Sequence, residues 1–512
     1  MFLNNEENQM KLNFSHMNYI NKISFIIVFL FLASQLSFAG GKDKDKGYQI
    51  KVKITGIKDT VCYLGYYYAD KQYILDTNKV DANGYCVFEG KEPLEGGIYF
   101  IYSPEKTLVQ ILIGEQRFSV ETDTKDLVGN MKVTGSIENK LFTDFHIFRM
   151  NNYNKVQALK ARLDKNKSNK DSTDFLNSEI DKIDKAVLAF MNEAESKYPN
   201  TLYSSIMKSN VQIDIPDSPK DEKGNEIDSL FALHYMQKHY FDNINFGDGR
   251  LVRTPILHQK IMDYLKRLVV PHPDSIIRAC DFIIEKSKAD SNVFRYALPT
   301  LTNYYETSKY MGMDAVFVHL AEKYYLSGQA WWADSTLTVK MQERVDDLKP
   351  TLLGGQAHNI IMYDTLLRPV PLHAIKADYT SIFFYEPDCG HCKKATPKMK
   401  KLAEAYKSKG FKVYGINIKT DIEEWKTFIK EYKIQEFINV SDPYYRSKFR
   451  DYFDIYSTPV IYLLDKDKNI LAKRLSPEQL EEMLRSKMGI KGDEGRILEK
   501  PEDVKEEEEE SH

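Results

Sequence analysis

Two cysteines separated by two residues are the clearest chemical signature in this sequence. They occur in the segment Cys389-Gly390-His391-Cys392. A tetrahedral zinc site would need two further ligands, and the sequence holds no second pair of this kind. A static structural bridge is the other alternative, but this short spacing is typical of exchanging pairs. We therefore expect a redox-active pair in which Cys389 attacks a disulfide and Cys392 resolves the mixed disulfide.

The residues around the pair predict a strand, a turn and a helix. The apolar run at residues 381–385 is typical of a buried strand, and a helical pattern begins at Lys393. Cys389 is thereby placed at the start of a helix, where free amides and the helix dipole stabilise a thiolate.

Charged neighbours are expected to adjust the reactivity of the pair. A negative charge on Asp388 should raise the pKa of Cys389, whereas a protonated or hydrogen-bonding His391 should stabilise the thiolate. Stabilising the thiolate stabilises the reduced form and makes the pair more oxidising. These opposing influences leave open whether the pair oxidises, isomerises or reduces its clients.

The composition is that of an ordinary multidomain globular protein. The chain has 512 residues, 42% of them hydrophobic and 28% charged, with a net charge of -3. This length predicts about three domains and the composition excludes collagen-like, disulfide-framework and wholly disordered classes. Without an overall basic charge, no nucleic-acid partner is expected.

The first 39 residues have the pattern of a cleaved export signal. Lys11 and Lys22 precede an apolar run at residues 23–33, which is too short to span a membrane, and small residues precede a cleavage position after Ala39. The alternative is an uncleaved anchor. Cleavage predicts a mature protein in the periplasm or cell envelope, with no stable membrane span and with disulfide chemistry permitted.

Three further segments differ in their residue pattern and composition. Residues 48–135 alternate between polar and apolar side chains with turn signals between short runs, which predicts an all-β sandwich-like module. Residues 137–350 have helical periodicity, and their many aromatics could form a core or line a ligand groove. Residues 491–512 carry a net charge of −6 (4 basic against 10 acidic residues) and are expected to be a solvated, disordered tail.

The remaining cysteines do not form a framework. Cys62 and Cys86 lie on two expected strands of the β-module, where they could form a bridge or remain unpaired core thiols. Cys280 lies among isoleucines and is expected to be a buried small hydrophobe.

Residues 351–490 resemble a thioredoxin-fold domain of the exported TlpA/ResA type. The resemblance rests on the cysteine motif, on Pro397 in the following helix and on the segment Ser457-Thr458-Pro459-Val460. It implies a strand at 411–418, an extra helical insertion at 421–450, a hairpin of 461–464 with 470–474, and a closing helix at 476–488. The β-module, ending near Gly135-Ser136 and Asn139, resembles one that precedes such domains in exported proteins of Gram-negative gut bacteria.

The resemblance also implies a function for the motif residues. Pro459 would be a cis-proline, and Thr458 would pair with the substrate backbone like an added strand. The dipeptide between the cysteines, Gly390-His391, is that of protein disulfide isomerases. The resemblance of the rest of the domain to the TlpA/ResA type instead implies a reductase. No metal and no organic cofactor is implied, and the partners would be protein thiols or disulfides with an unidentified electron donor or acceptor.

The sequence departs from this family at the residue that accepts a proton from the resolving cysteine. Relatives keep an acid at the positions of Phe383 or Ala395, and neither is acidic here. Glu386 and Asp388 are the nearest candidates along the sequence.

The function hypothesis is an exported thiol–disulfide oxidoreductase within a multidomain chain. The expected architecture is an N-terminal all-β sandwich-like module, an all-α middle domain and a C-terminal α/β thioredoxin fold. The alternative is an envelope binding or adaptor protein in which the redoxin domain is mainly a docking module. A peroxidase would need a lone cysteine in a threonine-rich loop, which the sequence does not contain.

Overall fold

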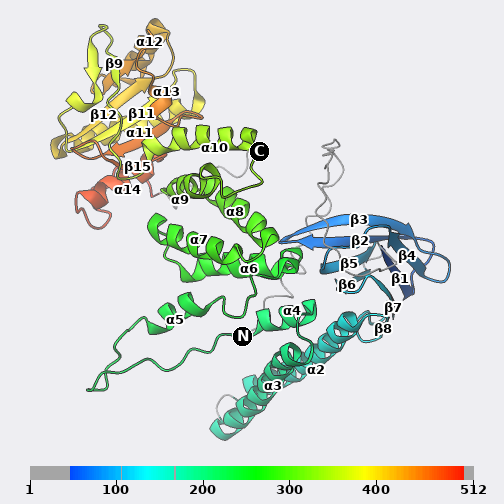
Figure 1. The fold of residues 1–512 in the computed structure, drawn as a ribbon. Helices are drawn as coiled ribbons and strands as arrows, with labels where there is room; N and C mark the ends of the chain where they lie inside the picture. The colour runs from blue at the N-terminus through cyan, green and yellow to red at the C-terminus, as the bar shows by residue number, and fades with distance from the viewer. Residues whose placement is uncertain (1–46, 105–106, 167–168, 501–512) are drawn as a thin grey trace. The chain divides into compact units, whose positions relative to one another are not determined.

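The computed structural model describes residues 47–104, 107–166 and 169–500 (Figure 1). The predicted export signal at 1–39 and residues 501–512 of the predicted tail lie outside this range. The chain divides into two compact units, one up to Leu268 and one from Val269, so that the predicted helical segment contributes to both.

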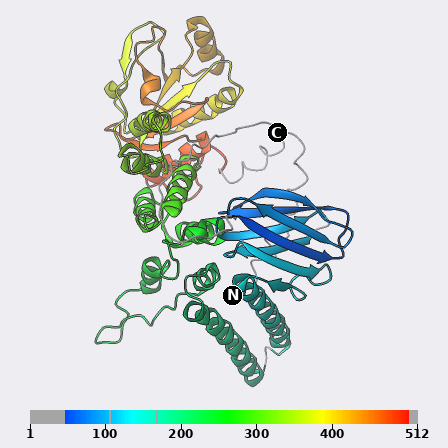
Figure 2. The ribbon, with the colours of Figure 1, turned by 45° about the vertical axis from the view of Figure 1, so that its right-hand side comes forward.

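The first unit begins with two four-stranded sheets that face each other (Figure 2). One sheet has the order β4-β1-β7-β8 and the other the order β3-β2-β5-β6. Alternate residues of β1, among them Ile50, Val52 and Ile54, are buried between the sheets. This agrees with the predicted β-module. The strands are β1 (Tyr48–Thr55), β2 (Val61–Tyr68), β3 (Lys71–Lys79), β4 (Tyr85–Gly90), β5 (Gly97–Ser103), β6 (Thr107–Ile113), β7 (Arg117–Asp123) and β8 (Lys132–Thr134).

Strand β3 is the one strand of this module, apart from the short β8, that the sequence pattern did not predict. It is an edge strand paired only with β2, and its residues Lys71 to Leu75 are all exposed. Because neither face is buried, its side chains lack the alternation by which a half-buried strand is recognised.

The rest of the first unit is helical. Ser136 caps α2, and Asn139 holds that helix to β6 by accepting from the Leu112 amide and donating to its carbonyl, both at 2.7 Å. The helix cap at Ser136 and the bonds of Asn139 thus mark the end of the β-module and the start of the helices. The helices are α2 (Ile137–Lys165), α3 (Lys170–Lys197), α4 (Leu202–Asn210), α5 (Phe231–His239), η2 (Gly249–Arg253), α6 (Pro255–Asp263) and the π-helix η3 (Tyr264–Leu268).

The second unit starts with the remaining helices of the middle segment. Buried apolar residues at helical spacing, such as Cys280, Ile283 and Ile284 on α7, form their core, so Cys280 is a buried small residue as predicted. These helices are α7 (Pro273–Ser287), α8 (Ser291–Glu306), α9 (Asp314–Leu320), the π-helix η4 (Ala321–Leu326), α10 (Ser335–Leu348) and η5 (Lys349–Thr351).

A seven-stranded sheet of order β10-β9-β13-β12-β11-β14-β15 forms the centre of the last domain. Strand β11 is an interior strand, parallel to β12 and antiparallel to β14. Its strands are β9 (Ile361–Tyr363), β10 (Pro369–Pro371), β11 (Tyr379–Tyr385), β12 (Phe411–Asn417), β13 (Ile438–Ser441), β14 (Val460–Leu464) and β15 (Ile470–Lys473).

Helices cover both faces of this sheet. Phe383 packs with residues of α11, α12 and α14, whereas Phe384 packs on the opposite face with Phe449 of α13. Burial on both faces explains the continuous apolar run of β11. The helices are η6 (Leu372–Ala374), α11 (Gly390–Tyr406), η7 (Lys407–Lys409), α12 (Ile422–Tyr432), α13 (Phe449–Tyr452) and α14 (Pro477–Lys487). The architecture of β-module, helices and α/β thioredoxin-like domain is the predicted one.

Two expectations near the C-terminus need correction. The segment 421–450 is not wholly helical, because Ile438–Ser441 forms the parallel strand β13, too short to be recognised from its pattern. Residues 491–500 are mostly exposed, as predicted, but they are not a free tail, since Leu498 is buried in the core of the last domain. The amides of Ile497 and Leu498 donate to the buried carboxylate of Glu481. Counting charges along the sequence cannot reveal such partners.

Among the described residues, no helix has both the length and the apolar content needed to cross a bilayer.

Candidate functional site

Cys389 lies at the start of helix α11. It is the N-cap residue, and the amide of Cys392 donates to its sulfur over 3.2 Å. The amide of Lys393 donates to the carbonyl of Cys389 over 3.0 Å, which closes the first turn of the helix. The sulfur therefore occupies the place of a capping acceptor, where a negative charge is favoured.

The turn at Thr458 and Pro459 lies against the same sulfur. The peptide bond between these two residues is cis, and the Cys389 thiol donates to the carbonyl oxygen of Thr458 over 3.4 Å. Thr458 lies two residues before β14, which is antiparallel to β11 with Val460 opposite Phe384, so its turn lies at the edge where β11 ends. The structure thus brings together the two motifs that lie 69 residues apart in the sequence.

The two sulfurs differ in exposure and acidity. Partial burial opposes ionisation of Cys389, but hydrogen bonds from the side chains of Cys392 and Thr458 and from the amides at the helix start outweigh it and lower the pKa of Cys389. Cys392 is fully buried, and burial together with the neighbouring Cys389 raises its pKa to about 12. This asymmetry favours Cys389 as the attacking thiolate.

A lysine pairs with the two acidic residues beside the nucleophile. Lys419 Nζ lies 3.2 Å from Glu386 Oε2 and 3.5 Å from Asp388 Oδ2. The pKa of Cys389 is lowered by hydrogen bonds at the helix start and the cis-proline turn. Lys419 lies where its charge offsets the opposing charge that the sequence assigns to Asp388. The candidate proton acceptors Glu386 and Asp388 face this lysine, and no described hydrogen bond joins their carboxylates to either sulfur.

Sequence reasoning missed Lys419, although the sheet explains its position. Strands β11 and β12 are parallel, and Tyr385 lies opposite Asn417. Residues just beyond both strands therefore meet at one edge of the sheet. The backbone of Lys419 is fixed there, since its amide donates to Asn417 Oδ1 over 3.1 Å and its carbonyl accepts from Ser441 Oγ over 3.0 Å.

The other residues singled out in the sequence lie around the sulfurs in different ways. Gly390 and His391 are exposed on the first turn of α11, and a Cβ at Gly390 would meet open space. Phe383 and Ala395, at the positions where the resemblance would place an acid, are buried apolar side chains. The buried Cys392 thus has no acidic neighbour at either position.

Cys62 and Cys86 lie in opposite sheets of the β-module. Both are buried in its core and neither forms a disulfide in this structure.

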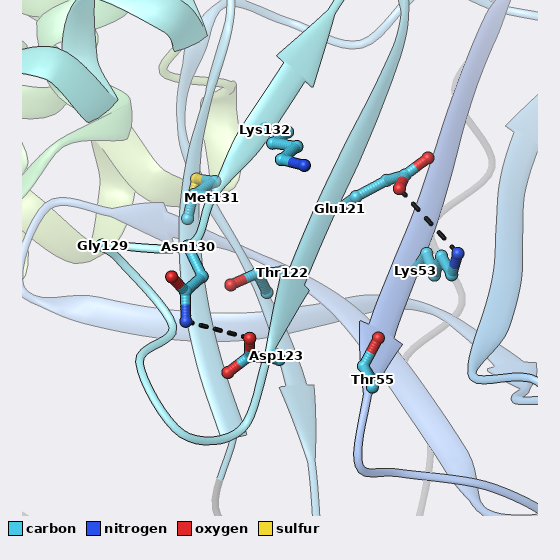
Figure 3. A pocket seen from close by; sticks show the side chains of 9 residues that line it. All are labelled: Lys53, Thr55, Glu121, Thr122, Asp123, Gly129, Asn130, Met131 and Lys132. Carbon is cyan, nitrogen blue, oxygen red and sulfur yellow. Dashed lines mark hydrogen bonds and ion pairs between the residues drawn. The ribbon is translucent and has the colours of Figure 1, made fainter.

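A polar pocket opens on the β-module, and none of its lining residues is a cysteine (Figure 3). Lys53 and Glu121 face each other across it at 3.9 Å, and Asn130 donates to Asp123 over 2.9 Å. Its lining is formed by Lys53, Thr55, Glu121, Thr122, Asp123, Gly129, Asn130, Met131 and Lys132. It contains no group for thiol chemistry. In the described part of the chain, no cluster of three His, Cys, Asp or Glu side chains suits a metal ion.

Comparison with protein families assigns the last domain. Residues 353–473 match the AhpC/TSA family. A solved structure described as a domain of a possible thiol-disulfide isomerase from Cytophaga hutchinsonii is 40% identical. The match covers 27% of this chain and 94% of that domain, with a TM-score of 0.26. The chain belongs to the thioredoxin-like thiol–disulfide oxidoreductase family.

Two other solved structures are similar to parts of this chain. A thiol:disulfide interchange protein from Bacteroides sp. is 28% identical, over 29% of this chain and 96% of its own, with a TM-score of 0.26. A thioredoxin-like protein from Bacteroides caccae is 22% identical, over 54% of this chain and 99% of its own, with a TM-score of 0.43.

The segments before the thioredoxin-like domain match families without an assigned function. Residues 48–142 match the domain of unknown function DUF4369, and residues 227–349 match the domain of unknown function DUF5106. No curated protein matches the chain.

Proposed function

We propose that this chain is an exported thiol–disulfide oxidoreductase that exchanges disulfides with protein clients through Cys389 and Cys392. The observation that carries the proposal is the half-buried sulfur of Cys389 at the start of α11, which accepts from an amide and lies against the cis-proline turn. Export to the periplasm or cell envelope is supported by the signal-like pattern of residues 1–39.

The first step is attack on a client disulfide. The Cys389 thiolate bonds to one client sulfur, the client S–S bond breaks, and the other client sulfur leaves as a thiolate. The backbone carbonyl and amide at Thr458 are the groups with which an extended client segment would pair.

The second step releases the client. The Cys392 thiol loses its proton and attacks Cys389, the mixed disulfide breaks, and the client leaves with its second thiolate. The pair has then given two electrons and holds a disulfide. A dithiol protein must reduce it again, or the same steps run backwards and oxidise the client.

The timing of the second step follows from the coupling between the two sulfurs. Burial and the neighbouring Cys389 thiol raise the pKa of Cys392 in the reduced protein. Once Cys389 is bound in a mixed disulfide, its thiol no longer opposes ionisation of Cys392, while Thr458 and the Glu386 backbone still favour it. Cys392 therefore becomes easier to ionise when it has to attack.

Reduction of insulin disulfides by the mature chain, with dithiothreitol as donor, tests the proposal. The parent chain should accelerate precipitation of the insulin B chain, and Cys389→Ser should abolish the acceleration. Cys280→Ser, which alters a buried thiol of the helical part, is the matched control and should keep it. Full activity of the Cys389 variant would refute the proposed function. Recovery of a mature N-terminus at Gly40 from a periplasmic extract would test export.

A further inference from the structure

We propose that Tyr456 and Arg344 form a client contact beside the cis-proline turn, by which helix α10 of the DUF5106 region favours polypeptide disulfides over small ones. This inference rests on the proposed function. It assigns to the helical part of the chain a role at the redox site.

Tyr456 presents a large aromatic ring to solvent two residues before Thr458. Its side chain is 87% exposed, far more than a tyrosine needs merely to hydrate its hydroxyl group. The carbonyl of Thr458 lies 3.4 Å from the nucleophilic sulfur. Tyrosine is among the residues enriched at the energetic centres of protein interfaces.

A contact with Arg344 orients the ring of Tyr456. The guanidinium of Arg344 on α10 lies 5.8 Å from the ring centroid, within the range of a cation–π contact. Arg344 is itself held at two further points, 3.3 Å from Asp454 Oδ1 and 3.5 Å from Glu306 Oε1. A helix outside the thioredoxin-like fold thereby supports one side of the loop that carries Tyr456.

Buried charges fix the base of this loop. The Asp454 carboxylate is 5% exposed and binds Arg474 of the thioredoxin-like domain as well as Arg344. Removing one partner of such a buried charge is costly, so the loop has little freedom to move away from α10.

A second buried contact keeps the helices against the same sheet. Lys473 of β15 pairs with Asp314 of α9 and donates to Thr351 Oγ1 over 2.9 Å. Lys473 is only 6% exposed. The helices and the thioredoxin-like domain are therefore joined in one compact unit, and Arg344 is a fixed part of the site's surroundings.

Distance along the loop determines which substrates can reach Tyr456. One residue, Ser457, separates it from Thr458, so the Cα atoms of Tyr456 and Thr458 lie no more than about 7 Å apart. A polypeptide paired with the turn covers this span, and a side chain next to its cysteine meets the ring. A disulfide with only two short hydroxyethyl groups does not. The fitting partner is an extended polypeptide with an apolar or aromatic side chain close to its disulfide.

The test measures kcat/KM of the full mature chain for two disulfides, insulin and 2-hydroxyethyl disulfide. Tyr456→Ser should lower kcat/KM for insulin about fivefold to tenfold, mainly through KM, and leave the small disulfide unchanged. Arg344→Met should give the same selective loss, and Arg344→Lys should restore part of it. Tyr73→Ser, at an exposed tyrosine of the β-module, is the matched control and should change neither value.

Unchanged insulin kinetics in Tyr456→Ser would overturn the inference, and so would an equal loss on both disulfides. A parent chain that reduces neither disulfide would instead refute the proposed function, on which the inference depends. Arg344→Met could weaken the interface with Asp454, but Tyr456→Ser changes only an exposed side chain and keeps the test valid.

Discussion

The amide of Cys392 donates to the sulfur of Cys389 over 3.2 Å. In a helix this amide has no backbone acceptor, because it belongs to the first turn. The nucleophile thus takes the position that serine or aspartate occupies at other helix starts, and ionisation of its sulfur strengthens the capping bond. The same geometry leaves Cys392 buried one turn further along, within reach of a mixed disulfide on Cys389.

Lys419→Met should raise the pKa of Cys389. The lysine offsets the charges of Glu386 and Asp388 next to the sulfur, and without it both carboxylates oppose the thiolate. The thiolate is the reactive form, so iodoacetamide should alkylate Cys389 about threefold more slowly below its pKa, and the rates should converge above it.

A variant without the two carboxylates distinguishes an effect of Lys419 through these carboxylates from a direct effect of the lysine on the sulfur. In Glu386→Gln/Asp388→Asn, adding Lys419→Met should change the alkylation rate much less. An equal decrease in both backgrounds would mean that Lys419 acts on Cys389 directly, and Lys419→Arg should preserve the parent rate.

Only one of the five cysteines should react in the folded, reduced protein. Cys389 is half-buried with a lowered pKa, whereas the other four are buried in cores. Brief alkylation at neutral pH, followed by peptide mass spectrometry, should modify Cys389 alone, and all five should react in urea. Comparable modification of Cys280, Cys62 or Cys86 in the folded protein would contradict the cores described above.

Removing residues 491–512 should destabilise the thioredoxin-like domain, whereas removing only 501–512 should not. Glu481 is fully buried and accepts from the amides of Ile497 and Leu498 at 2.8 and 2.7 Å. Loss of these donors, with exposure of the site of Leu498, should cost about 1–3 kcal/mol. Urea unfolding of the two shortened chains compares them directly. Equal midpoints would show that residues 491–500 contribute nothing to stability.

Acidification should weaken the first unit through His146 on α2. Burial, with a smaller contribution from Arg149, lowers the pKa of His146 to about 4 from its ordinary value of 6.5. Between these two values the unfolded chain binds a proton that the folded chain does not, so stability falls as the pH falls through this window.

The loss at pH 5 from this histidine should be about 1–2 kcal/mol, measured by urea unfolding against neutral pH. His146→Phe keeps an aromatic ring against Phe142 and removes the titrating group, so it should lose less stability on acidification. An NMR titration that placed the pKa of His146 near its ordinary value would contradict the assignment.

Local patterns predicted the elements that carry the cysteines. The apolar run of β11 and the helical pattern after Cys392 are contiguous, and the turn between them leaves no other place for Cys389 than a helix start. The cis-proline segment was recognisable because its residues are adjacent. Fold class could be predicted for the same reason, since burial leaves a period in the sequence wherever one face of an element is covered.

Contacts between distant segments could not be predicted in this way. Lys419 meets Glu386 only because β11 and β12 are parallel neighbours, and Arg344 meets Tyr456 only because α10 lies against the loop that also carries Asp454. The acidic stretch before Lys500 was misjudged because its apolar members, such as Leu498, find their partners on α14 and α11. Such pairings depend on tertiary packing and leave no local period.

Trapping of the reaction intermediate tests the central claim most directly. A Cys392→Ser chain, incubated with a peptide that contains one disulfide, should form a stable mixed disulfide that peptide mass spectrometry locates at Cys389. A Cys389→Ser chain should trap none. A mixed disulfide at another cysteine, or none with the Cys392 variant, would contradict the assignment of Cys389 as the attacking sulfur.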